Sequence, residues 1–151
     1  MDVLVGLFFI VVGILFLVYG VPIIMVLISD KRNKERISEV LCNKTPISVK
    51  EYYSLKNHAK SLEGVYVLHN VDDDKYYVGQ SSNVWNRVDQ HFSCKGNDGV
   101  YYDYVVNEAE FTILLIPFDN SRFTSLNEME RVFIAHYNAY SRGYNKTRGN
   151  K

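Results

Sequence analysis

The amino-acid sequence predicts an α+β fold: a small domain with a central three-stranded antiparallel sheet flanked by helices, preceded by one N-terminal transmembrane helix. Three observations lead to this prediction. The first is a long apolar run, residues 3–28, which contains no acidic or basic residue. The second is a pair of strand-like segments, residues 64–69 and 75–79, separated by a turn sequence. The third is a further apolar strand, residues 111–118, set among segments with helical patterns.

The apolar run is long enough to cross a membrane. As a helix, the 26 residues Val3–Ile28 would extend about 39 Å, and a hydrocarbon core is about 30 Å thick. The remaining residues form too small a domain to bury such a helix on all sides. A cleaved signal peptide would have a basic start and a shorter apolar run, whereas this chain starts Met-Asp. We therefore expect residues 1–29 to be an uncleaved anchor in contact with membrane lipid.

The charges that flank the anchor predict its orientation. Lys31, Arg32, Lys34 and Arg36 follow the apolar run, and only Asp2 precedes it. The positive-inside rule then predicts a single-pass membrane protein whose C-terminal domain faces the cytoplasm. After the anchor we expect a polar stalk with a short helix over residues 30–61, and then a domain over residues 62–150.

Cap signals predict the short helix and those of the domain. Thr45 and Pro46 favour the start of a helix that extends to about residue 58. Residues 81–83 cap a helix that extends to about residue 92, and residues 125–128 form a capping box for a helix that extends to about residue 140. Residues 100–106 are compatible with either a short helix or a strand.

The chemistry-bearing residues recur in a specific order. Gly64, Val65 and Tyr66 stand on the first strand, and after ten intervening residues Tyr77, Val78 and Gly79 stand on the second. Three further groups of residues follow the paired motifs. Arg87 and His91 stand four residues apart on the next helix. Glu130 is followed by Phe133 and Ile134, and the last group is Gly143, Tyr144 and Asn145, followed by Gly149.

This series resembles the GIY-YIG nuclease superfamily, with Val in place of Ile in both motifs. The resemblance spans roughly residues 62–150 and departs from the family at Asn150, where a glycine is expected. It implies the fold predicted above, a phosphodiester hydrolase activity, and a catalytic set of Tyr66, Tyr77, Arg87, His91 and Glu130. It also implies that Gly64 and Gly79 are structural and that Asn145 is a supporting polar contact to nucleic acid.

The residue types fit this chemistry by themselves. Phosphodiester hydrolysis requires an activated water and compensation of phosphate charge. Glu130 can bind a single Mg²⁺ or Mn²⁺ through hard oxygen ligands, and the guanidinium of Arg87 can bind phosphate oxygens. A metal ion and Arg87 would favour the phenolate of Tyr66, which could then act as the general base. The sequence leaves open whether the base is Tyr66 or His91. Glu128 is the alternative metal ligand, but its position suits a cap.

The C-terminal segment predicts weak electrostatic contacts with nucleic acid. Residues 141–151 contain Arg142, Lys146, Arg148 and Lys151 and no acid. These cations can bind phosphates without reading bases. We expect a metal-dependent endonuclease with little sequence specificity, acting on DNA rather than RNA. The alternatives are a non-catalytic module that tethers DNA or RNA at the membrane, and a protein-interaction platform.

Overall fold

The structure is a computed structural model that describes residues 3–150. Asp2 and Lys151, which enter the orientation and charge predictions above, lie outside the described residues. The chain divides into two compact units, residues 1–38 and residues 39–151.

The N-terminal unit is helical. α1 (Val3–Leu15), a π-helical turn η1 (Phe16–Gly20) and α2 (Val21–Leu41) follow one another without a break. Its large apolar side chains from Leu7 to Ile28 are exposed, except Val21, which is partly exposed. By length and composition the helix from Leu7 to Leu41 is suited to cross a membrane. The helix continues to Leu41, into the first part of the predicted polar stalk, residues 30–61.

The second unit contains a four-stranded antiparallel sheet in the order β1-β4-β2-β3. The three strands expected from the sequence are present as β2 (Gly64–Asn70), β3 (Lys75–Ser81) and β4 (Phe111–Pro117). β2 is central and pairs with β3 on one side and β4 on the other, while β3 is an edge strand. The predicted α+β fold is confirmed, with one additional strand, β1 (Ile47–Ser48).

β1 replaces the helix start predicted at Thr45 and Pro46, and that prediction is wrong. Ile47 pairs with Ile113 of β4, and helix α3 (Val49–Lys56) begins only after Ser48. The side chain of Ser48 accepts a hydrogen bond from the backbone N–H of Glu51 at 3.2 Å, so it is the actual cap. A two-residue strand has no periodicity, and for this reason the sequence pattern does not show it.

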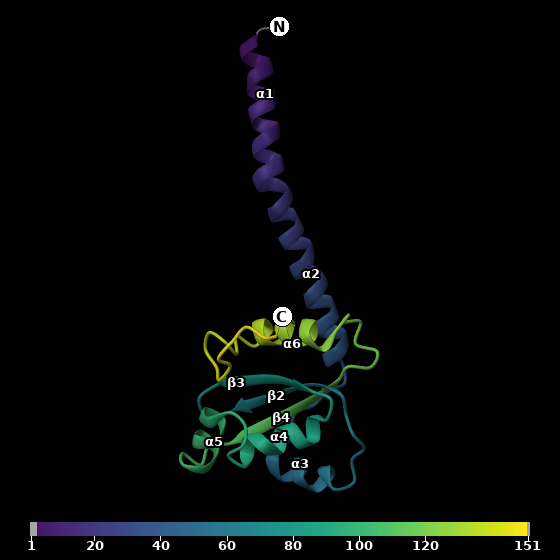
Figure 1. The fold of residues 1–151 in the computed structure, drawn as a ribbon, viewed down its shortest axis with the longest axis vertical. Helices are drawn as coiled ribbons and strands as arrows, with labels where there is room; N and C mark the ends of the chain where they lie inside the picture. The colour runs from purple at the N-terminus through teal and green to yellow at the C-terminus, as the bar shows by residue number, and fades with distance from the viewer. Residues whose placement is uncertain (1–2, 151) are drawn as a thin grey trace. The chain divides into compact units, whose positions relative to one another are not determined.

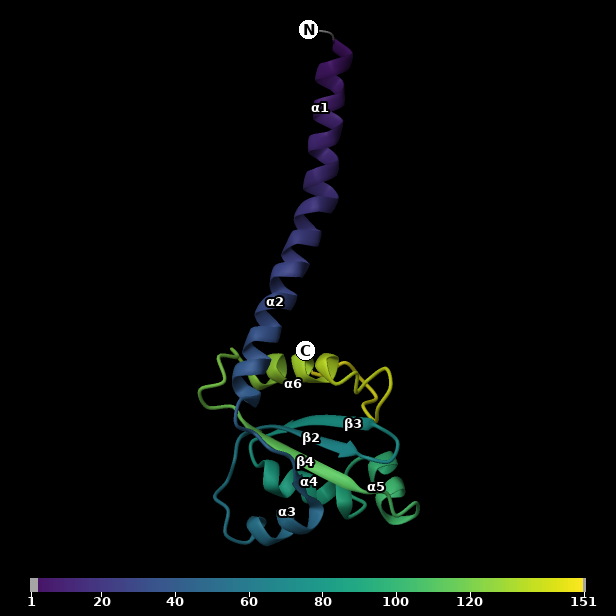
Figure 2. The same cartoon turned by 180° about the vertical axis from the view of Figure 1, so that it is seen from behind.

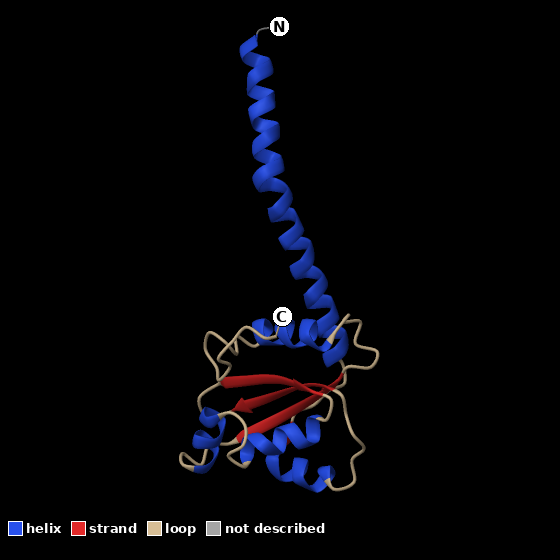
Figure 3. Cartoon of the chain, viewed as in Figure 1, coloured by secondary structure: helices blue, strands red, loops and turns tan. Residues whose placement is uncertain are grey.

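Helices cover both faces of the sheet (Figure 1, Figure 2, Figure 3). α3, α4 (Val84–Phe92) and α5 (Asp98–Val105) lie on one face, and α6 (Leu126–His136) lies on the other. Because side chains of a strand alternate between faces, Tyr66 and Leu68 of β2 join the core beneath α4. Residues 100–106, for which the sequence allowed either a helix or a strand, are helical through Val105, as part of α5.

The caps of α4 and α6 match their predictions. Asn83 accepts a hydrogen bond from the N–H of Asn86 at 3.3 Å, and Ser125 accepts one from the N–H of Glu128 at 3.1 Å. α6 ends at His136, four residues before the predicted end. These caps fix where α4 and α6 begin, and thereby the positions of Arg87 and Glu130.

Candidate active site

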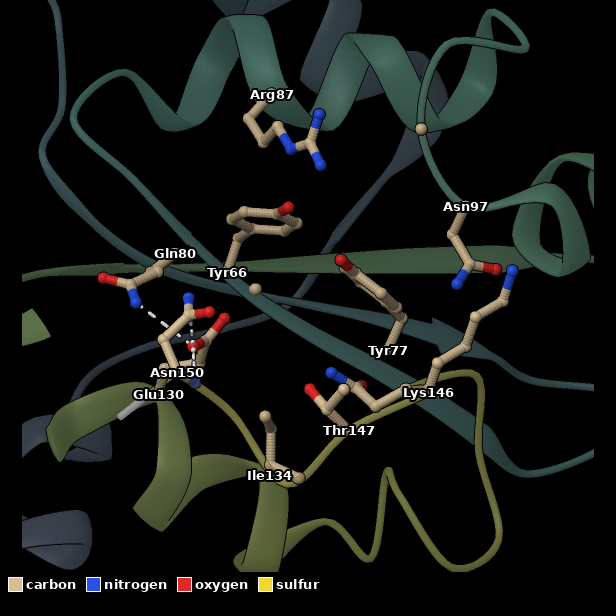
Figure 4. Close-up of a pocket in the computed structure, with 13 residues that line it drawn as sticks. Tyr66, Tyr77, Gln80, Arg87, Asn97, Glu130, Ile134, Lys146, Thr147 and Asn150 are labelled. Carbon is tan, nitrogen blue, oxygen red and sulfur yellow. Dashed lines mark hydrogen bonds between the residues drawn. The ribbon is translucent and has the colours of Figure 1, made fainter. Parts of the chain in front are cut away.

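A polar cavity of about 330 Å³ opens at the edge strand β3. Figure 4 shows Arg87 of α4 on one side of the cavity and Glu130 of α6 on the other, with Tyr66 and Tyr77 between them. The predicted residues that line it are Tyr66, Tyr77, Gly79, Arg87, Glu130, Asn145 and Lys146. Residues from two strands, two helices and the C-terminal segment therefore meet in one place, although they are up to 80 positions apart in the sequence.

The two motif glycines permit close approaches. Gly79 is the cross-strand partner of Tyr66, and a Cβ at Gly79 would overlap the Tyr66 hydroxyl. A Cβ at Gly64 would overlap the backbone carbonyl of Ile116 in β4. Any side chain at Gly79 would displace the Tyr66 ring, so this glycine sets the position of the phenol directly.

His91 is fully buried and contacts Tyr66 from behind the cavity. Its Nε2 lies 2.8 Å from the Tyr66 hydroxyl oxygen, and its Nδ1 accepts a hydrogen bond from the backbone N–H of Asn97 at 2.9 Å. Burial and the neighbouring charge of Arg87 lower the pKa of His91 to about 3, so the ring is neutral at pH 7. Since Nδ1 is an acceptor, the single ring proton is on Nε2, and Nε2–H donates to Tyr66.

The pKa of Tyr66 is subject to opposing influences. Burial, followed by the neighbouring Tyr77, raises the pKa of Tyr66 well above its ordinary value, and Arg87 acts against this rise. Burial also raises the pKa of Tyr77, again opposed by Arg87. Both phenols are therefore protonated at neutral pH unless further positive charge enters the cavity.

Glu130 is buried, and one of its oxygens is saturated with hydrogen-bond donors. Oε2 accepts from Gln80 Nε2 at 3.1 Å and from both the backbone N–H and the side-chain amide of Asn150 at 3.2 Å each. By contrast, Glu128 accepts two hydrogen bonds from Thr124, both at 2.8 Å, and does not line the cavity. Glu130 is thus the carboxylate at the site, and Glu128 belongs to the helix start.

The residues at the cavity fit a single divalent cation. The described part of the chain contains no group of three or more His, Cys, Asp or Glu side chains that could bind a metal. It does contain one rigid carboxylate, Glu130, whose Oε2 is occupied by donors while the cavity around it is polar. This donor set suits Mg²⁺ or Mn²⁺, which retain several waters and take few protein ligands, better than it suits Zn²⁺.

The predicted nucleic-acid contacts differ in where they lie. The side-chain amide of Asn145 is bonded on both sides to Val78: its Oδ1 accepts from the Val78 N–H at 2.8 Å, and its Nδ2 donates to the Val78 carbonyl at 2.7 Å. Lys146 is exposed and lines the cavity, and its Nζ lies 3.7 Å from Oδ2 of Asp98. Arg148 is exposed and lines a second cavity, while Arg142 is exposed and lines neither of the two.

Three residues at the site were missed by the sequence reasoning. Gln80 and Asn150 orient Glu130, and Asn97 orients His91. The one available signal was Asn150, which departs from the resembled pattern. Gln80 and Asn97 are ordinary polar residues in sequence, and only the tertiary fold brings them to the catalytic side chains.

Residues 62–145 match the family model of the GIY-YIG catalytic domain. The chain belongs to the GIY-YIG nuclease superfamily, and this membership supports a nuclease-type function and nucleic acid as its partner. Searches among curated proteins and among solved structures found no match.

Proposed function

We propose that the chain is a divalent-metal-dependent endonuclease that hydrolyses phosphodiester bonds, with DNA as the substrate and little sequence specificity. The observation that carries this proposal is the convergence of Tyr66, Arg87 and Glu130 on one polar cavity beside an edge strand. A phenol, a guanidinium and a carboxylate at one cavity supply a base, a phosphate ligand and a metal ligand.

Tyr66, rather than His91, is the general base of this proposal. Both ring nitrogens of His91 are engaged, one by Asn97 and one by Tyr66, and its side chain is fully buried. Tyr66 lines the cavity, and its oxygen receives the His91 proton donor, which stabilises a phenolate. His91 is accordingly a positioning residue, and Tyr77 is a second phenol at the site.

Glu130 is the metal ligand in this scheme. Its Oε2 is held by Gln80 and Asn150, which fixes the plane of the carboxylate before any cation arrives. When bound, the cation would supply positive charge that lowers the pKa of Tyr66 and compensates the charge of the scissile phosphate. The guanidinium of Arg87 orients that phosphate from the opposite side of the cavity.

The membrane anchor belongs to the same proposal. The apolar helix and the cations at Lys31, Arg32 and Lys34 support a single-pass protein whose nuclease domain faces the cytoplasm.

The residues predicted to contact nucleic acid have different roles in this proposal. Asn145 is a positioning residue, because both ends of its side-chain amide form hydrogen bonds with the backbone of Val78. Lys146 and Arg148 are the phosphate contacts of the tail, and Arg142 adds only general positive charge.

Cleavage by the full chain in detergent micelles tests the proposal. The parent chain and the variants Tyr66→Phe and Glu130→Ala are each incubated with Mg²⁺ or Mn²⁺. The substrates are supercoiled duplex DNA, single-stranded DNA, branched DNA and RNA. We expect DNA cleavage by the parent chain and loss of cleavage in both variants. Equal cleavage by parent and variants would contradict the assignment, and binding without cleavage would indicate a non-catalytic nucleic-acid-binding module.

A further inference from the structure

A second cavity, of about 310 Å³, lies beside the first and shares Ile134 with it. Arg131 and Tyr140 line it, and so does Arg148 of the C-terminal segment. Its volume is at the lower end of the range of small-molecule sites, roughly 300–1,000 Å³. It is therefore large enough for one small ligand group.

The lining of this second cavity combines an apolar floor with positive charge. Ile134, Ala135 and the ring of Tyr140 supply the apolar surface, and Arg131 and Arg148 supply two guanidinium groups. No Asp or Glu of the described chain lines it. A complementary ligand is therefore an anion that also carries an apolar or planar part.

Contacts already present in the protein orient both guanidinium groups. Arg148 lies over the Tyr140 ring, 5.4 Å from the ring centroid, in a cation–π contact. Arg131 donates a hydrogen bond to the backbone carbonyl of Asn150 at 2.7 Å. Less side-chain freedom is lost when such pre-oriented cations bind a phosphate than when free ones do.

The C-terminal strap, residues 146–150, connects the two cavities. Lys146, Thr147 and Asn150 line the first cavity, and Arg148 lines the second. On α6, Glu130 faces the first cavity and the next residue, Arg131, lines the second. A strand whose scissile phosphate lies at Glu130 thus has its neighbouring nucleotides within reach of the second cavity.

We propose that the second cavity is a subsite for a nucleotide flanking the scissile bond. Arg131 and Arg148 bind its phosphate, and the apolar floor formed by Ile134, Ala135 and Tyr140 supports its sugar and base. This inference rests on the proposed nuclease function and adds where the substrate strand leaves the active site. It also distinguishes two cations of the C-terminal segment, because Arg148 lines the second cavity whereas Arg142 lines neither cavity.

Equilibrium binding tests the subsite. The full chain in detergent micelles, carrying Glu130→Gln to prevent cleavage, is titrated into a fluorescently labelled single-stranded DNA oligonucleotide, and anisotropy is measured. We expect Arg148→Gln, which removes a phosphate contact, and Tyr140→Leu, which removes the ring that supports the base, each to weaken binding about tenfold. Tyr140→Phe, which retains the ring, should bind as the parent does.

Arg142→Gln is the matched control, since it removes the same charge from the same exposed segment outside both cavities. We expect it to change affinity by less than about twofold at physiological salt. A loss in Arg142→Gln equal to that in Arg148→Gln, or an unchanged affinity in Tyr140→Leu, would overturn the subsite while leaving the nuclease function intact. Absence of any binding by the parent at low salt would overturn both.

Discussion

Several neighbouring groups act on the pKa of the Tyr66 hydroxyl. Burial raises the pKa of this phenol, and the proximity of Tyr77 raises it further, while Arg87 lowers it. The Nε2–H of His91 donates to the same oxygen at 2.8 Å and favours the phenolate. In the free chain the raising influences prevail, so the proposed role of Tyr66 as the base requires the positive charge that a bound divalent cation would supply.

A pH–rate profile separates Tyr66 from His91 as the base. Because the pKa of His91 is lowered to about 3, the single-turnover rate should show no inflection between pH 6 and 7, and it should rise toward alkaline pH as Tyr66 ionises. Tyr66→Phe should reduce the rate by about 100-fold or more, which is the usual size of a general-base contribution. An inflection near pH 6.5 that disappears in His91→Gln would assign the base to His91 instead.

The buried His91 also makes stability dependent on pH. The unfolded chain binds a proton at His91 below pH 6.5, whereas the folded chain does so only near pH 3, so stability falls as pH falls through this interval. Between pH 7 and pH 4.5 we expect a loss of roughly 2–3 kcal/mol from this residue. Urea titrations of the full chain, followed by the fluorescence of its single tryptophan, Trp85, measure it.

The matched comparison is His91→Gln, which replaces the titrating imidazole with a neutral amide that can still form hydrogen bonds. Between pH 7 and pH 4.5 the loss of stability should be smaller in His91→Gln than in the parent chain by roughly 2–3 kcal/mol. His136, whose pKa burial also lowers, is present in both chains and cancels in the difference. Identical pH dependence in the two chains would show that His91 is not a buried neutral imidazole.

The residue types of the site were largely predictable from the sequence, but the hydrogen bonds that orient their side chains were not. Tyr66, Tyr77, Arg87 and Glu130 stand at motif positions, and the fold brings them to one cavity as expected. The partners that orient them were not predictable. Gln80 lies 50 residues from Glu130 in the chain, and a hydrogen bond of that separation leaves no periodic signal in the sequence.

Among the elements, long periodic segments and strong caps were predictable, and short or terminal ones were not. β2 and β3 were expected from two strand-like segments around a turn sequence, β4 from a continuous apolar run, and α6 from its capping box. β1 has only two residues and depends on pairing with β4, which no local pattern encodes. The edge of β3 is likewise completed by tertiary contacts, since Asn145 pairs with the backbone of Val78.

The C-terminal strap is the element whose role a substitution isolates best. Asn150 donates to Glu130 Oε2 through both its backbone N–H and its side-chain amide. Asn150→Ala removes only the side-chain donor, so it should loosen the carboxylate without removing it. We expect the Mg²⁺ concentration for half-maximal cleavage to rise about tenfold, the usual scale for partners of metal ligands, with little change in the rate at saturating Mg²⁺.

Arg142→Ala is the control for this experiment, because Arg142 is an exposed residue that precedes the strap and does not line the active cavity. Its Mg²⁺ requirement should equal that of the parent chain. A rate that falls in Asn150→Ala at every Mg²⁺ concentration, with an unchanged midpoint, would mean that Asn150 acts on the reaction rather than on the orientation of the metal ligand.

For the whole molecule, the anchor predicts a side of the membrane. Cys42 and Cys94 are exposed and both follow the apolar helix, so a cytoplasmic domain would place both out of reach of reagents outside the cell. A membrane-impermeant maleimide should leave intact cells unlabelled and label the protein after permeabilisation. A chain with both cysteines replaced by serine and with Asp2→Cys should show the opposite behaviour, and labelling of Cys94 in intact cells would reverse the orientation.

The central claim is that this membrane-anchored domain cleaves nucleic acid with Glu130 as its metal ligand. The most direct test is the single-turnover rate of DNA cleavage by the full chain at saturating Mg²⁺, compared with Glu130→Gln. This variant keeps the size of the side chain and removes its charge. We expect binding within about twofold of the parent and a cleavage rate lower by at least about 100-fold, on the scale of removing one catalytic group. Cleavage by Glu130→Gln at the parent rate would contradict it.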